Sequence, residues 1–208
     1  MTLYTELTAY SNRLLLEGQQ ISPERKVLLQ QLAAYIQQKR QRGKEVHLNF
    51  ICTHNSRRSL ISQIWTAAAV AYFRMPGIHV YSGGTEATAF NPRAVAALER
   101  VGFQIEKPGG ENPHYQVSFS KDHPPLECFS KTFDDPVNPQ RNFAAIMTCS
   151  DADENCPFIP GVELRLPLTY EDPKVADDTP EEQQRYDERV RQIGREIFYA
   201  INLLKEQN

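Results

Sequence analysis

The chain has 208 residues, a formal net charge of −3 and 40% hydrophobic residues. This length is enough to bury a core in one domain, and the slight negative charge gives no basic footprint for nucleic acid. There is no cationic start followed by an apolar run as in a signal peptide, and no apolar stretch reaches the roughly 20 residues that span a bilayer. We therefore expect a cytoplasmic protein with no membrane partner, in which four cysteines favour redox chemistry over a disulfide framework.

Residues 1–44 are predicted to form a helical extension. Two amphipathic helices are expected, over about 3–17 and 23–42. Their apolar stripes are Leu3, Leu7, Leu14 and Leu15 in the first helix and Val27, Leu28, Leu32 and Ile36 in the second. We expect these helices to pack on the main domain, with a homodimer contact as the alternative.

The next segment predicts a strand that leads into an anion-binding loop. The apolar run VHLNFIC, residues 46–52, ends at Cys52, and Arg58 follows six positions later at an apparent helix start. A five-residue loop of this kind can turn its backbone N–H groups inward, and such a nest at a helix N-terminus binds a tetrahedral anion.

Individual roles in this loop follow from side-chain chemistry. Cys52 is the candidate nucleophile, and the planar guanidinium of Arg58 is suited to gripping two oxygens of the anion. Asn55 tolerates a positive φ in mid-loop. The predicted anion-binding residues are Thr53, His54, Asn55, Ser56, Arg57, Arg58 and Ser59. The spacing C-x5-R is only moderately specific, because a buried strand cysteine before a basic helix start gives the same pattern by chance.

The rest of the chain alternates between strands and helices. Strands are expected at about 78–82, 143–149 and 163–166, and helices after the first, second and fourth strands, the last over about 180–205. The sequence thus predicts a single α/β domain with a four-stranded parallel sheet covered by helices on both faces. The candidate site lies at the carboxyl end of the first strand, where such sheets bind ligands.

An insert is predicted from about 107 to 140. The alternating runs HYQVSFS and LECFSKTF, joined through Asp122-His123-Pro124-Pro125, are typical of a β-hairpin. Its aromatic residues either wall the substrate mouth or, as we favour, cover the edge of the core; they are Tyr115, Phe119, Phe129 and Phe133. Cys128 is expected to be structural.

Three stretches together resemble a known family. They are CTHNSRRS at the loop, SGGTEATAFNPRAV after the second strand, and the late pair Cys149 and Cys156 in TCSDADENCP. The chain resembles the low-molecular-weight protein tyrosine phosphatase superfamily over about 46–204, closest to its thioredoxin-coupled arsenate reductase branch. The resemblance implies the fold predicted above and an enzyme that acts on an oxyanion.

The resemblance implies a three-cysteine relay. Cys52 would attack arsenate, Cys149 would attack the adduct and release arsenite, and Cys156 would take over the disulfide for reduction by thioredoxin. No tightly bound cofactor is implied. The polar segment SDADEN is expected to be mobile, as this exchange requires. Cys149 as a buried core cysteine is the alternative. No metal site is expected, because no CxxC pair or nearby histidine completes a zinc set.

The resemblance also implies a general acid, an aspartate before a proline. Asp172-Pro173 is the preferred candidate over Asp135-Pro136, which falls in the insert. The closest alternative function is a phosphatase acting on phosphotyrosine or small phosphate esters through a phosphocysteine. It is weakened because residues 174–176 lack the tyrosines usual there, while the charge of Arg57 is unusual for the reductase branch. A non-catalytic oxyanion-binding module is a third hypothesis.

Overall fold

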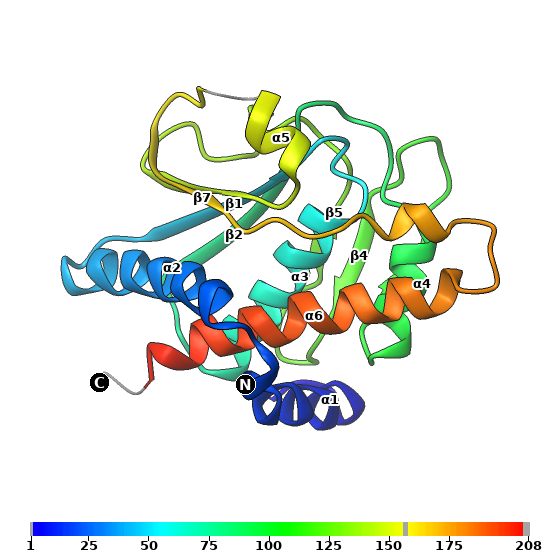
Figure 1. The fold of residues 1–208 in the computed structure, drawn as a ribbon, viewed down its shortest axis with the longest axis horizontal. Helices are drawn as coiled ribbons and strands as arrows, with labels where there is room; N and C mark the ends of the chain where they lie inside the picture. Colours follow the sequence, from blue (N-terminus) through cyan, green and yellow to red (C-terminus); the bar gives the residue numbers. More distant parts are fainter. Residues whose placement is uncertain (1, 156–157, 206–208) are drawn as a thin grey trace.

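The computed structural model describes residues 2–155 and 158–205. Its central sheet has four parallel strands in the order β2-β1-β6-β7 (Figure 1). These strands are β1 (Val46–Cys52), β2 (Ile78–Gly84), β6 (Phe143–Met147) and β7 (Val162–Pro167). The predicted α/β class and four-stranded parallel sheet are confirmed. All of β6 and all of β1 except one residue are buried, as in strands covered on both faces.

The two faces of the sheet carry separate apolar clusters. Leu48 and Phe50 of β1 point into the main core, together with Trp65 of helix α3 (Arg58–Tyr72). Ile51 and Met147 point the other way, into a smaller cluster that includes a residue of helix α5 (Ser150–Asn155). Because side chains alternate along a strand, one apolar run supplies both clusters. The strand end that carries Cys52 lies in the smaller cluster.

The N-terminal extension is helical, as predicted. It comprises α1 (Thr5–Leu16), the short 3-10 helix η1 (Gly18–Gln20) and α2 (Pro23–Gln41). Both α-helices pack against the long helix α6 (Glu182–Leu203), and α2 also reaches β7 (Figure 1). Lys39 and Tyr35 of α2 donate hydrogen bonds to the carboxylate of Glu163 on β7, at 2.7 and 2.8 Å. The extension thus packs on the main domain; a homodimer contact stays a prediction.

The insert forms the expected hairpin within a larger sheet than predicted. Strands β4 (Tyr115–Ser118) and β5 (Leu126–Cys128) are antiparallel, and β3 (Gln104–Glu106) adds a third strand from before the predicted start of the insert at 107. The brevity of β3 explains why no alternation signalled it. Tyr115 and Phe119 are buried in the main core, as the core interpretation expects, whereas Phe133 is only partly buried and packs against the smaller cluster that contains Cys52.

Two further segments differ from expectation. Residues 150–155, expected to be mobile, form helix α5, and Arg165 of β7 holds its Asp153 through a 2.9 Å ion pair. Helix α6 spans Glu182–Leu203, slightly shorter than the predicted range of about 180–205. Helix α4 (Pro92–Arg100) follows β2, as predicted. Across residues 2–155 and 158–205, no helix is long and apolar enough to cross a membrane.

Candidate active site

The loop of residues 53–57 turns its carbonyl oxygens outward. The segment after β2 donates backbone bonds to three carbonyls here, from Thr85 to Cys52 at 3.1 Å, from Glu86 to Thr53 at 2.8 Å and from Asn91 to Ser56 at 2.9 Å. In the part of the chain that the structure describes, the N–H groups of residues 53–57 donate no hydrogen bond. These donors are therefore free for a tetrahedral anion, and the positive end of α3 adds to their field.

Side chains inside the loop fix its shape. Asn55 has φ 44°, and its amide nitrogen donates to the hydroxyl of Ser59 at 2.8 Å while its amide oxygen accepts from the backbone of Lys131 at 3.0 Å. The same Ser59 hydroxyl lies 3.0 Å from the sulfur of Cys52. The sulfur of Cys52 therefore has a hydrogen-bonding partner that is itself held in place.

Arg58 and Asp172 meet at this loop. Arg58 donates from Nη2 to Asp172 at 2.7 Å and from Nη1 to the carbonyl of Tyr170 at 3.0 Å. Its Nε is buried and has no hydrogen-bond partner among the described residues, which leaves a donor for an oxyanion. Asp135, the rival Asp-Pro candidate, instead accepts from the backbone of Val137 in its own turn.

The other predicted anion-binding side chains point in several directions. Ser56 donates its hydroxyl to the carbonyl of Ala89 at 2.7 Å. His54 is exposed, with Nε2 3.7 Å from the carboxylate of Glu86. Arg57, predicted to add charge beside the anion, has a guanidinium that bonds the hydroxyl of Tyr186 on α6 at 2.9 Å. The side chains of Ser56, His54 and Arg57 therefore contact groups outside the loop, and these three residues offer an anion their backbone N–H groups.

Cys149 lies next to the loop because of the sheet register. Ile51 of β1 pairs with Met147 of β6, and two residues further along the hydroxyl of Thr53 lies 3.4 Å from the sulfur of Cys149. Cys149 is fully buried, and its sulfur accepts from the backbone of Ala152 at 3.4 Å. Both Cys52 and Cys149 belong to the smaller apolar cluster. Cys156, the predicted third thiol, lies outside the described residues.

The insert supplies a contact that sequence reasoning missed. Ser130 donates its hydroxyl to the carbonyl of His54 at 2.8 Å, and accepts from the backbone of Thr88 at 2.8 Å. It thereby joins the anion loop to the segment after β2. No local pattern marks Ser130, because its partners are 76 and 42 residues away in the chain.

Cys128 lies outside the cluster that contains Cys52 and Cys149. It lies in the main core with no exposed surface, and this burial raises the pKa of its thiol to about 12. A thiol held in its protonated form is a poor nucleophile. The structural role expected for Cys128 agrees with this setting.

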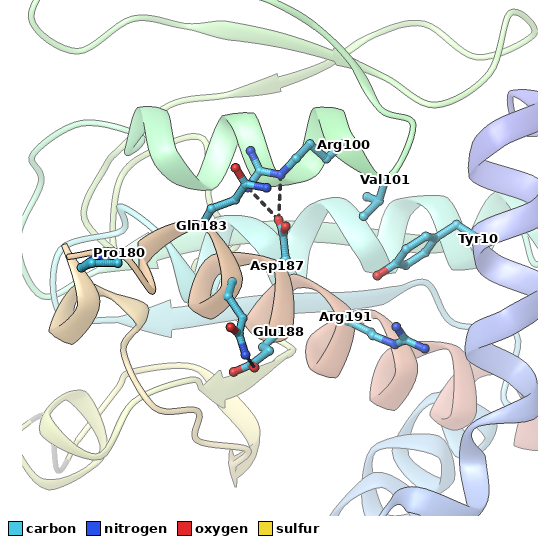
Figure 2. Close-up of a pocket in the computed structure, with 9 residues that line it drawn as sticks. Tyr10, Arg100, Val101, Pro180, Gln183, Asp187, Glu188 and Arg191 are labelled. Atoms are coloured by element: carbon cyan, nitrogen blue, oxygen red, sulfur yellow. Dashed lines mark hydrogen bonds and ion pairs between the residues drawn. The ribbon is translucent and has the colours of Figure 1, made fainter. Parts of the chain in front are cut away.

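Two of the surface hollows are lined in part by helix α6. Figure 2 shows a pocket of about 640 Å³ between α1, α4 and α6, where Arg100 donates to Asp187 at 2.6 Å. Arg191, also on its wall, is paired with Glu17. A smaller hollow of about 410 Å³ borders Asp172 and is lined by Arg185 and Arg189 of α6. Of these two hollows, only the second is lined by a candidate site residue, Asp172.

Comparison with known proteins gives one consistent group of relatives. No family model matches the chain. An arsenate reductase of Bacillus licheniformis is 30% identical over 152 residues, which cover 71% of this chain and 89% of the relative. Arsenate reductase 2 of Staphylococcus epidermidis is 31% identical over 124 residues, or 60% of this chain and 76% of the relative.

Solved structures support the fold. A low-molecular-weight phosphotyrosine phosphatase of Vibrio cholerae superposes with a TM-score of 0.53 at 14% identity, covering 78% of this chain and 99% of that protein. A low-molecular-weight protein tyrosine phosphatase of Bacillus subtilis gives 0.50 at 12% identity, with 77% and 98% covered. At these identities the likeness concerns the fold alone.

Proposed function

Because this chain belongs to the arsenate reductase family, we propose that it reduces arsenate to arsenite with Cys52 as the nucleophile. The thiolate of Cys52 forms a sulfur–arsenic bond, and one arsenate oxygen leaves as water after accepting a proton from Asp172. The N–H groups of residues 53–57 and the guanidinium of Arg58 hold the remaining oxygens, so the charge that develops on them is stabilised by fixed donors.

The reduction itself is a transfer of two electrons from sulfur to arsenic. Cys149 attacks the sulfur of Cys52, a disulfide forms, and the electron pair of the broken sulfur–arsenic bond stays on arsenic, which leaves as arsenite. Cys156 then attacks Cys149, which frees the Cys52 thiolate. An external dithiol, for which we propose thioredoxin supplied with electrons from NADPH, reduces the Cys149–Cys156 disulfide. A reducing cytoplasm is the compartment that such a cycle requires.

The observation that carries this proposal is the position of Cys149. A reductase needs a second thiol within reach of the nucleophile, whereas a hydrolase does not. The β1–β6 register brings Cys149 beside Thr53, the residue that follows Cys52, in one apolar cluster. Since Cys149 is buried at the start of the short helix α5, the relay requires this helix to unwind locally.

The alternative is a phosphatase of phosphotyrosine or small phosphate esters. The 2.7 Å contact between Arg58 and Asp172 favours it equally, because an acid beside the anion also serves ester cleavage. In that reaction Cys52 would carry the phosphoryl group and water would release it. Cys149 and Cys156 would then have no role in turnover.

The test is a pair of assays on one preparation. We expect NADPH consumption with arsenate, thioredoxin and thioredoxin reductase to be abolished in Cys149→Ser and Cys156→Ser, while any hydrolysis of p-nitrophenyl phosphate survives. Cys128→Ala is the matched control, since that cysteine is buried away from the anion loop and should leave turnover intact. Arsenate turnover that persisted in Cys149→Ser would refute the relay, and strong ester hydrolysis without arsenate turnover would establish the phosphatase.

A further inference from the structure

Arg57 departs from the anion loop toward helix α6. Its Nε donates to the hydroxyl of Tyr186 at 2.9 Å, and its side chain is only 11% exposed. Tyr186 is itself 1% exposed. The bond from Nε to a buried phenol holds the guanidinium against α6, so any contact with an anion would have to come from its remaining N–H groups. The position of Arg57 beside Arg58 in the sequence therefore does not imply a shared role.

The partner of this pair is Asp177. Tyr186 donates its hydroxyl proton to Oδ1 of Asp177 at 2.8 Å, and Arg57 reaches Oδ2 with Nη2 at 3.5 Å. Both carboxylate oxygens of Asp177 are thus contacted by Tyr186 or Arg57, and Arg93 of α4 lies 3.8 Å from Oδ2 as well. Burial, and the bond donated to Asp177, raise the pKa of Tyr186 to about 12, so the hydroxyl keeps its proton at any working pH.

Asp177 ends the segment that carries the candidate acid. Asp172 and Asp177 flank the single 3-10 turn η2 (Pro173–Ala176), and Asp177 closes that turn with a 3.0 Å backbone bond to Lys174. Only the four residues of η2 separate Asp172 from Asp177, so fixing Asp177 limits the movement of Asp172. Arg57 also lies 3.9 Å from the carboxylate of Asp172.

We propose that Arg57 and Tyr186 are positioning residues, which clamp η2 so that the carboxyl of Asp172 faces the anion, and that Arg57 does not bind the substrate. The clamp joins three elements that are far apart in the chain: the anion loop, η2 and α6. This assignment rests on the proposed function for the role of Asp172 as acid. The second part of the proposal, that Arg57 does not contact the oxyanion, does not depend on the role of Asp172.

Tyr186→Phe isolates the clamp, because it removes one hydroxyl and keeps the buried ring. The matched control is Tyr72→Phe: Tyr72 is the last residue of α3, at the opposite end from Arg58, and its hydroxyl donates to Asn12 at 2.7 Å. We expect kcat for arsenate to fall about 10- to 100-fold in Tyr186→Phe, because a misplaced acid loses much of the 10²–10⁴-fold that proton transfer contributes. KM for arsenate stays within about twofold, since the anion donors are untouched.

Comparing esters with different leaving groups separates a misplaced acid from a general loss of structure, because only the former depends on the basicity of the leaving group. Where the protein hydrolyses aryl phosphates, Tyr186→Phe should slow phenyl phosphate more than p-nitrophenyl phosphate, because the weakly basic nitrophenolate needs little protonation. Amide hydrogen exchange of residues 174–177 should also rise in Tyr186→Phe and stay unchanged in Tyr72→Phe. Equal slowing of both esters, or unchanged exchange, would overturn the clamp.

Binding decides the role of Arg57 separately. Inorganic phosphate should protect Cys52 from iodoacetamide in Arg57→Gln as well as in the unmodified protein, and protection should be lost in Arg58→Gln. Loss of protection in Arg57→Gln with normal protection in Tyr186→Phe would show that Arg57 binds the anion and refute the assignment. A protein that binds phosphate but turns over neither arsenate nor esters would refute the proposed function alone, and the exchange and protection measurements would still decide the clamp.

Discussion

Replacing Gly84 by alanine is expected to disrupt the anion loop from a position that carries no reactive group. Gly84 is the last residue of β2 and pairs with Cys52 in the parallel register. A Cβ at this position would lie 2.4 Å from the carbonyl oxygen of Glu86, 2.6 Å from that of Thr53 and 2.7 Å from the backbone nitrogen of Asn55. All three neighbours are backbone atoms, so no side-chain rotation relieves the contact.

The magnitude follows from the kind of contact. Overpacking a tight site costs typically 1–3 kcal/mol, and rigid backbone neighbours put Gly84→Ala near about 3 kcal/mol. For a chain of this size that corresponds to a fall in Tm of roughly 6–12 °C. A shift of the loop by about 1 Å would also reduce turnover by on the order of 100-fold. Gly109→Ala is the control, because nothing lies within 4 Å of its added Cβ, and it should change stability by less than about 0.5 kcal/mol.

The assay combines urea unfolding with phosphate protection of Cys52 against iodoacetamide. We expect Gly84→Ala to lose both stability and protection, and Gly109→Ala to lose neither. If Gly84→Ala unfolded at the same urea concentration as Gly109→Ala and phosphate still protected its Cys52, the close approach between β2 and the anion loop would not be needed for the site, and the reasoning would fail.

Three further predictions concern stability and reactivity. Arg25→Met should destabilise the protein by about 3–5 kcal/mol in urea unfolding, because it leaves the buried carboxylate of Glu196 without its 2.8 Å partner; a second change, Glu196→Gln, should restore most of the loss. Partial burial alone raises the pKa of Glu163, but hydrogen bonds such as that from Lys39 lower it overall, so its stabilising contribution is present above about pH 4.5 and is lost as the pH falls through the lowered pKa. Glu163→Gln should therefore lower the free energy of unfolding at neutral pH. Below the lowered pKa of Glu163, the variant and the unmodified protein should have similar free energies of unfolding. Cys128 should resist iodoacetamide in the folded protein at about pH 8 and react on unfolding, and rapid labelling in the native state would contradict the burial that raises its pKa to about 12.

The anion loop could be foreseen because its geometry is local. An apolar run that ends at Cys52 and a helix that starts at Arg58 leave only five residues between them, so chain connectivity alone keeps the two side chains near each other. The same holds for Asn55, whose φ of 44° is a conformation that asparagine tolerates. The four sheet strands and the helices of the extension could also be predicted, since periodicity within each segment reports which face is buried.

Segments without a periodic signal were harder to predict. β3 has three residues, too few to show alternation, and it forms because β4 is available as a partner. The polar composition of residues 150–155 indicates exposure but does not distinguish a mobile loop from a short helix. The ion pair between Asp153 and Arg165, which lies 12 residues later on β7, helps to hold the helical form.

By itself, the sequence determined the fold class and the position of the loop between Cys52 and Arg58, whose anion chemistry stays a proposal. Only the tertiary structure decided what each side chain meets: Cys149 faces Thr53 through the β1–β6 register, Ser130 reaches His54 from the insert, and Arg57 joins Tyr186 instead of the anion. These partners are 96, 76 and 129 residues apart in the chain. Contacts over such separations depend on sheet register and on how whole elements pack, and neither is encoded in the few residues around a motif.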